Sequence, residues 1–358
     1  MEREASREPL VEQIGQLKRD RQALILAHNY QLGEVQDVAD IVGDSLELSR
    51  KAAAAEAKII VFCGVHFMAE TAAILAPEKT VLLPVREADC PMARMADAEA
   101  LRRKKREHPD AVVVCYVNTT AEVKAECDIC CTSANAEQVL QTIPPEREVL
   151  FVPDQYLGSY VRERTGRRIV LWPGYCSTHA RIQPRHIEAQ RARHPGAPVL
   201  VHPECRPEVI ALADAALSTG GMVRFARETE APVVLIGTEL GMVHRLRREN
   251  PDVEFVPVTE QAICPNMKLT ELQDVLWSLE RMQHRITVPE QIRVRAAAAV
   301  QHMVSIAGQG DRPPTTDTEW GGRPTGATVN PGDDPATSAP DNAPADAASG
   351  AAHAKERA

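Results

Sequence analysis

Aromatic side chains are scarce in this chain of 358 residues, where Phe, Trp and Tyr make up 4% of the sequence. A core built from such a sequence is expected to be mostly aliphatic. The first residues show no basic stretch followed by an apolar one, which predicts that a secretory signal is absent. The longest apolar run, at about residues 111–117, is far shorter than the roughly 20 residues that a membrane-spanning helix needs. We therefore expect a cytoplasmic protein with no membrane partner.

Excess positive charge and nucleotide-binding loops are also missing. The formal net charge is −9, and nucleic-acid binding needs a basic face, so nucleic acid is not expected as a partner. A dense basic run at residues 102–106 lies in a helical pattern beside acidic residues and is predicted to be a solvent-exposed face. Neither G-x-G-x-x-G nor a Walker loop occurs, and we expect no nucleotide cofactor.

Cysteine, in contrast, is abundant, with nine residues. Thiols stay unpaired in a reducing compartment, so metal or cluster ligation is favoured over disulfide bonds. Three of the cysteines lie within the segment CDICC at residues 127–131. From about residue 309 onward, Pro, Ala, Thr, Asp and Gly dominate and aliphatic residues nearly disappear, which predicts a disordered tail.

Short apolar runs alternate with helical patterns through residues 8–308. Examples of the nine predicted strands are ALILA at 23–27, AVVVCYV at 111–117 and PVVLIG at 232–237. Apolar strands that alternate with helices are typical of parallel sheets covered on both faces.

Three stretches of this region resemble one another: ADIVGDSLELSRKA at 39–52, CDICCTSANAEQVL at 127–140 and ADAALSTGGMVRFA at 213–226. Two further features keep the same spacing of 86 to 88 residues, one at strand ends and one in segments that run strand, Pro, loop, Cys. The aligned residues are Ser45, Ser133 and Thr219; Tyr30, Asn118 and Glu204; and Cys90, Cys176 and Cys264. Three features with nearly one period indicate three copies of a small α/β domain of about four strands.

The predicted fold class is therefore α/β, with three homologous αβα domains that carry short parallel sheets around a pseudo-threefold axis. Ligand groups in such domains gather beyond the carboxyl ends of the strands, so the aligned residues are expected to converge on one central pocket. The predicted limits are a helical lead-in at 1–22, repeats at 23–107, 108–195 and 196–308, the last with a C-terminal helix, and the tail at 309–358.

A metal or cluster on the axis would take one cysteine from each repeat, namely Cys90, Cys176 and Cys264. Three thiolates suit zinc or an iron–sulfur cluster, and a cluster with three cysteine ligands keeps one iron open as a Lewis acid. The CDICC cysteines align instead with small or apolar residues of the first repeat. They are expected to pack as small hydrophobic side chains, with a redox pair or an ancillary metal site as the alternative. These three are Cys127, Cys130 and Cys131.

The remaining cysteines are unmatched between repeats. Cys63 and Cys115 lie in strand patterns and are expected in the core. Cys205 stands beside Glu204 and is the strongest competitor for a place in the ligand set.

The aligned hydroxyl residues fall where helix N-caps are predicted. Three helix N-termini directed at one axis would form an anion pocket, which indicates a substrate with several carboxylates or a phosphate. Strand ends would supply the acids, bases and hydrogen-bond donors of the walls. The predicted wall residues are His28, Tyr30, Tyr116, Asn118, His202 and Glu204.

An ordered set of motifs across residues 20–305 resembles the quinolinate synthase family, the iron–sulfur enzymes of NAD biosynthesis. The motifs are LAHNYQ, GDS, YVNTTAEVK, TSANA, GYC, HPEC, STGGM, GTELGMVHRLRRENP and CPNMKLTELQDVLWSLE. The resemblance implies three α/β domains and a [4Fe–4S] cluster on Cys90, Cys176 and Cys264.

The reaction implied by this resemblance condenses iminoaspartate with dihydroxyacetone phosphate to quinolinate, phosphate and two waters. It also implies a functional link to the enzyme that forms iminoaspartate. Tyr30 matches a tyrosine implicated in acid–base steps, and Glu204 and His202 are further expected proton-transfer groups, with Glu204 as a principal base. The substrate-binding residues implied are His28, Ser45, Tyr116, Asn118, Ser133, His202, Glu204 and Thr219.

Two other functional hypotheses are consistent with the same residues. A zinc-dependent lyase or aldolase would use the three thiolates as zinc ligands. A cluster-based redox sensor or electron carrier would need Cys205 or a CDICC cysteine as a fourth ligand.

Overall fold

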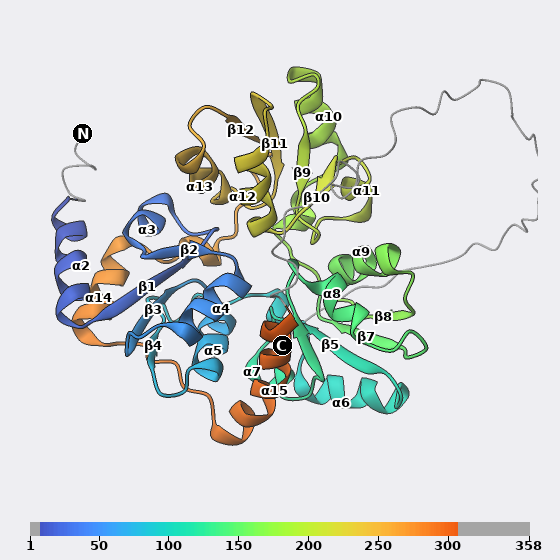
Figure 1. The fold of residues 1–358 in the computed structure, drawn as a ribbon, viewed down its shortest axis with the longest axis horizontal. Helices are drawn as coiled ribbons and strands as arrows, with labels where there is room; N and C mark the ends of the chain where they lie inside the picture. Colours follow the sequence, from blue (N-terminus) through green and yellow to red (C-terminus); the bar gives the residue numbers. More distant parts are fainter. Residues whose placement is uncertain (1–7, 307–358) are drawn as a thin grey trace, which may run out of the picture. The chain divides into compact units, whose positions relative to one another are not determined.

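The computed structural model describes residues 8–306, which form three four-stranded parallel sheets with helices between the strands (Figure 1). The predicted α/β class with three αβα domains is confirmed. The predicted tail at 309–358 lies outside the described residues. Within residues 8–306, no helix is both long and apolar enough to cross a membrane.

The first sheet has the strand order β2-β1-β3-β4. Its central strands, β1 (Ala23–His28) and β3 (Ile59–Cys63), are apolar at almost every position, as expected for strands buried on both faces. The edges are β2 (Ile41–Gly43) and β4 (Thr80–Leu82). The helices of this region are α2 (Glu8–Asp20), α3 (Gly33–Val38), α4 (Ser45–Ala54) and α5 (His66–Leu75).

The second and third sheets repeat this order as β6-β5-β7-β8 and β10-β9-β11-β12. Their strands are β5 (Val112–Tyr116), β6 (Ile129–Cys131), β7 (Val149–Val152), β8 (Ile169–Leu171), β9 (Val199–Val201), β10 (Ala215–Ala216), β11 (Val233–Gly237) and β12 (Glu254–Pro257). Their helices are α6 (Ala98–Glu107), α7 (Ala121–Lys124), α8 (Ala136–Gln141), α9 (Gln155–Thr165), α10 (Pro184–Arg193), α11 (Pro207–Ile210), α12 (Thr219–Glu228) and α13 (Met242–Glu249).

Three of these strands were not among the nine predicted from apolar runs. They are β2, β6 and β10, each two or three residues long and each at the edge of its sheet. Each lies inside one of the self-similar stretches of sequence. The three edge strands therefore place the aligned residues 45, 133 and 219 at equivalent positions in the three domains.

The chain after residue 270, which the predicted limits grouped with the third repeat as its C-terminal helix, makes its main contacts with the first two repeats. Helix α14 (Leu272–Arg281) contacts α2 and β3 through Val275 and Leu279, in the core of the first sheet. Helix α15 (Glu290–Ile306) contacts β6, α7 and α5, and so joins the first two repeats.

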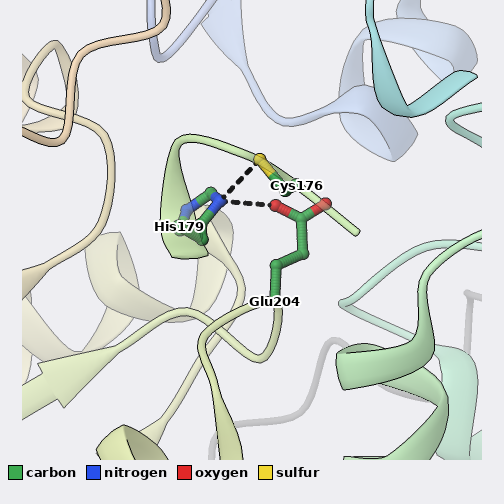
Figure 2. Close-up of side chains that lie close together, drawn as sticks. All are labelled: Cys176, His179 and Glu204. Atoms are coloured by element: carbon green, nitrogen blue, oxygen red, sulfur yellow. Dashed lines mark hydrogen bonds and ion pairs between the residues drawn. The ribbon is translucent and has the colours of Figure 1, made fainter. Parts of the chain in front are cut away.

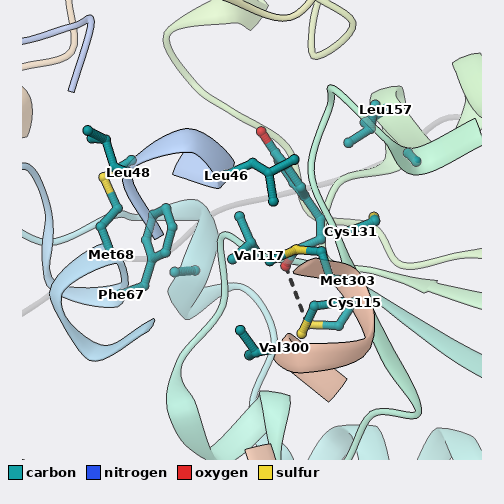
Figure 3. Packing of buried hydrophobic residues seen from close by; sticks show 14 of the residues in the cluster. Leu46, Leu48, Phe67, Met68, Cys115, Val117, Cys131, Leu157, Val300 and Met303 are labelled. Carbon is teal, nitrogen blue, oxygen red and sulfur yellow. Dashed lines mark hydrogen bonds between the residues drawn. The ribbon is translucent and has the colours of Figure 1, made fainter. Parts of the chain in front are cut away.

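Figure 3 shows the apolar cluster around α15, where Val300 and Met303 lie near Cys115 and Cys131. Cys130 and Cys131 are fully buried in this cluster, and Cys127 packs against it. The prediction that the CDICC cysteines pack as small hydrophobic side chains is confirmed for Cys130 and Cys131. Cys127 is half-buried, and the thiols of Cys127 and Cys130 both contact that of Cys115.

Candidate functional site

One central cavity collects every residue that the sequence nominated for the site. The cavity is lined by the carboxyl ends of strands from all three sheets, as expected for parallel α/β domains. The nominated residues in its wall are His28, Tyr30, Ser45, Cys90, Tyr116, Asn118, Ser133, Cys176, His202, Glu204, Thr219 and Cys264. Each repeat contributes four of them.

The three cysteines of the cavity occupy equivalent local structures. Each lies just before a short 3-10 helix, at η1 (Met92–Arg94), η2 (His179–Arg181) and η3 (Asn266–Lys268). Backbone N–H groups of these turns donate to the sulfurs of Cys90, Cys176 and Cys264. Such donors favour a thiolate.

Burial outweighs these donors. It raises the pKa of Cys90 to about 12, and burial together with the Glu204 charge raises that of Cys176 well above its usual value. Thiolates at these positions therefore require additional positive charge close by. A bound metal ion or iron–sulfur cluster supplies such charge, so the donor set fits a metal centre.

The backbone N–H groups of two of the cysteines donate to a buried or half-buried carboxylate. Asp89 Oδ1 accepts from Cys90 at 2.8 Å, and Glu239 Oε1 accepts from Cys264 at 3.0 Å. Asp154 caps α9 through the N–H groups of Tyr156 and Leu157. Carboxylates thus fix the backbone of the Cys90 and Cys264 loops.

Glu239 is fully buried and forms an ion pair with Lys268 at 2.9 Å. The Lys268 ammonium also donates to the backbone oxygen of Tyr30 at 2.5 Å. The pair therefore connects the Cys264 loop to the end of β1. The sequence pattern does not indicate this ion pair, because neither residue belongs to the aligned sets.

Glu204 and Cys176 are both in contact with one imidazole, that of His179 (Figure 2). Nδ1 of His179 lies 2.7 Å from Glu204 Oε2 and 3.2 Å from Cys176 Sγ. The three ligand atoms lie close enough together to hold a metal ion. His179 was also missed from sequence, although its place three residues after Cys176 was a usable signal.

The other ring nitrogen of His179 faces two hydroxyl groups. Nε2 lies 2.9 Å from Thr238 Oγ1 and 3.4 Å from Tyr30 Oη, and these two oxygens are 2.7 Å apart. The rings of His179 and His202 stack with centroids 4.7 Å apart. A continuous chain of polar contacts thus runs from Tyr30 through His179 to Glu204.

The acidities of these groups differ strongly. Burial opposes ionisation of Glu204, but His179 and His202 together hold its pKa well below the usual range. Burial and the Glu204 charge raise the pKa of Tyr30 and Tyr116 well above 10. Burial, helped by His202, lowers the pKa of His28 to about 3. The cavity therefore combines an ionised carboxylate with protonated phenols and a neutral imidazole.

Two buried oxygen atoms in the cavity wall have no hydrogen-bond partner within residues 8–306. They are Glu204 Oε1 and Asn118 Oδ1. Buried polar atoms are rarely left unpaired in folded proteins, so such atoms in a cavity mark places where a ligand or water binds.

The predicted helix caps are wrong by one or two positions. Asp44 caps α4, accepting from the N–H groups of Leu46 and Glu47, and Ser218 caps α12. Ser45 and Thr219 are instead the first residues of these helices. Because other residues cap the helices, the hydroxyl groups of the site are available to other partners. Ser133 Oγ, for example, lies 3.1 Å from His202 Nε2.

Cys205 does not reach the cavity. It is fully buried among apolar residues of the third sheet, with its sulfur directed at the Gly237 oxygen. All nine cysteines lie within the described residues, and three of them line the central cavity. Neither Cys205 nor a CDICC cysteine is placed to act as a fourth ligand.

Three parallel αβα domains around a buried cavity of thiols, imidazoles and carboxylates define an α/β enzyme with a candidate metal centre. Comparison with known proteins gives its family. Residues 12–305 match the family model described as "Quinolinate synthetase A protein". The chain belongs to the quinolinate synthase family, whose enzymes serve NAD biosynthesis.

Named relatives match nearly their full lengths. The quinolinate synthase of Dehalococcoides mccartyi strain CBDB1 is 59% identical over 84% of this chain and 99% of its own. That of Desulforudis audaxviator is 55% identical over 83% of this chain and 98% of its own. That of Methanosarcina barkeri is 51% identical over 83% of this chain and 97% of its own.

Proposed function

We propose that this enzyme condenses iminoaspartate with dihydroxyacetone phosphate to give quinolinate, phosphate and two waters. The observation that carries the proposal is the convergence of four residues from each repeat, including three cysteines, on one cavity. The reaction involves no net oxidation or reduction. It therefore requires polarisation of oxygen atoms and proton transfer, not electron transfer.

Cys90, Cys176 and Cys264 would hold a [4Fe–4S] cluster. Three cysteine ligands leave one iron open, and when bound the cluster supplies a Lewis acid to an oxygen of the substrate. The convergence of these three thiols, one from each repeat, on one cavity supports this assignment.

Both substrates are anions, and the cavity offers them neutral donors. Ser45 and Thr219 are the first residues of α4 and α12, where the helix dipole favours negative charge. Nδ1 of His28 accepts from the Tyr30 N–H at 3.1 Å, so the ring proton resides on Nε2 as a further donor. We assign substrate binding to these residues with Tyr116, Asn118, Ser133 and His202.

Proton transfer is assigned to Glu204, His179 and Tyr30. Glu204 is ionised, and its unpartnered Oε1 is free to accept a proton. Tyr30 retains its proton and serves as a donor. His179, in contact with both, and His202, which faces Glu204, carry protons between them.

A second candidate is a zinc-dependent lyase or aldolase, favoured by the proximity of Cys176, His179 and Glu204. Anaerobic purification separates the two. About four irons per chain with turnover of both substrates supports the synthase, whereas one zinc per chain and no quinolinate overturns it. We place the reaction in the cytoplasm, since all nine cysteines are unpaired, and link it functionally to the enzyme that supplies iminoaspartate.

A further inference from the structure

A second, larger cavity of about 530 Å³ lies beside the central one. It is formed by α4, α12, the Arg245 side chain of α13 and the residues just before α8. We call it the basic cavity, because its wall contains five cationic side chains. They are Arg50, Lys51, Arg224, Arg227 and Arg245.

The basic cavity and the central cavity share a wall. Asp44 lines both of them. Leu46, Ala134 and Gly220 line the basic cavity, and each directly follows, in sequence, a hydroxyl residue of the central cavity. The segments that present Ser45, Ser133 and Thr219 therefore separate the two spaces.

The net charge of this wall is positive, opposite in sign to that of the whole protein. The chain carries a net charge of −9, yet the wall contains two carboxylates against its five cations. The Asp44 carboxylate is engaged in the cap of α4. Burial, with the Asp44 charge, raises the pKa of Glu47, which weakens the second negative charge. A local positive potential inside an anionic protein attracts anions.

Two of the cations are held in place by one carboxylate. Arg227 and Arg245 both bond to Glu249, at 2.8 and 2.7 Å. Arg245 also donates to Asn29 Oδ1 at 2.8 Å, and Asn29 donates to Thr219 Oγ1 at 2.9 Å. A hydrogen-bonded chain thus joins the basic cavity to a hydroxyl of the central cavity.

The lack of a side chain at Gly220 allows the start of α12 to approach the Asp44 cap of α4. A Cβ atom there would lie 2.7 Å from an Asp44 carboxylate oxygen and 3.8 Å from an Arg224 nitrogen. The start of α12 is therefore in close contact with the cap of α4, between the two spaces.

We propose that the basic cavity is an entrance site that binds the phosphate group of the triose phosphate substrate before it enters the central cavity. This inference rests on the proposed function. Phosphate carries close to two negative charges, and guanidinium groups match its geometry with paired N–H donors. A cavity of this volume accommodates a small phosphate ester, not a polymer.

The test compares Arg224→Gln and Lys51→Gln in the iron-loaded enzyme. Both residues line the basic cavity and neither lines the central one. Each variant is expected to raise KM for dihydroxyacetone phosphate about 3- to 10-fold and to leave kcat within about 2-fold. The salt dependence of kcat/KM should also weaken.

Arg191→Gln is the matched control, because it makes the same change in net charge at a residue that lines neither cavity. Arg191 forms a solvent-exposed ion pair with Asp214. An unchanged KM in Arg224→Gln and Lys51→Gln, or an equal rise in the control, overturns the proposal.

A binding measurement keeps this test separate from the proposed reaction. Inorganic phosphate is titrated into the unmodified enzyme and Arg224→Gln, with binding followed by ³¹P line broadening. At least 3-fold weaker binding in the variant supports the entrance site even if no quinolinate is formed. Equal affinity overturns the entrance site, and turnover of the unmodified enzyme then still stands as evidence for the synthase.

Discussion

Nδ1 of His179 lies 2.7 Å from the carboxylate of Glu204, and both side chains are almost completely buried. This contact joins a residue that the sequence nominated to one that it did not. It explains how a carboxylate far from solvent stays ionised, since the imidazole compensates for lost hydration.

Replacing Glu204 with Gln keeps the shape of the side chain and removes the base. The variant is expected to retain its iron and bind substrate but lose about 100-fold or more in kcat. Anaerobic turnover, iron content and substrate titration test this. Glu208→Gln, an exposed change in the same region, is the control and should be unaffected. Turnover near the unmodified level would remove Glu204 from proton transfer.

Replacing Cys90, Cys176 or Cys264 with Ser should each abolish iron binding, because oxygen is a poor substitute for thiolate sulfur. Cys131→Ala, within the apolar cluster of α15, should leave iron near four per chain. Iron and acid-labile sulfide are measured after anaerobic reconstitution. Iron retained in Cys176→Ser but lost in Cys131→Ala would reverse the assignment.

Glu239→Gln should destabilise the fold by about 3 kcal/mol, since it leaves the Lys268 ammonium without its buried partner. Urea unfolding of the metal-free protein measures this. The double variant Glu239→Gln, Lys268→Gln should recover part of the loss. If the double variant is no more stable than Glu239→Gln, the ion pair is not the cause.

Glu126 joins helices α6 and α15 through bonds from Arg102 and Arg295, at 2.7 and 2.8 Å. Burial opposes its ionisation, but the two arginines lower its pKa. The stabilisation by these ion pairs is therefore complete above the pKa of Glu126 in the unfolded chain. It is lost as pH falls through the lower pKa of Glu126 in the folded protein. Glu126→Gln should cost about 1 kcal/mol at pH 7.

The cost of Glu126→Gln should shrink as pH falls below about 4.5, where the unfolded chain takes up a proton, and should vanish below the lower pKa of the folded protein. Glu99→Gln, which removes an exposed pair with Arg103, is the control and should change stability little at any pH. A cost that stays constant down to pH 3 would show that packing, not charge, accounts for the effect.

The internal period allowed much of the fold to be predicted, because residues one period apart occupy equivalent places on equivalent strands. It indicated Cys90 and Cys264 equally well, because both end a segment that runs strand, Pro, loop, Cys. The edge strand β10 escaped prediction because two residues show no periodicity. His179 and Lys268 escaped because their roles depend on loops that differ between the repeats.

The exact N-cap residue of each helix could not be predicted from the sequence. The sequence Gly43-Asp44-Ser45 offers two adjacent capping residues, and only the backbone angles decide between them. Asp44 has extended angles and Ser45 begins the helix, so the cap falls one residue earlier than predicted.

One aligned position in the central cavity is filled by three residues of different chemistry, namely Tyr30, Asn118 and Glu204. A trimer of identical subunits could build the same cavity, but it would repeat one side chain three times at each position. Joining the three units in one chain removes that symmetry. An asymmetric substrate can then meet an acid on one side, an amide on another and a phenol on the third.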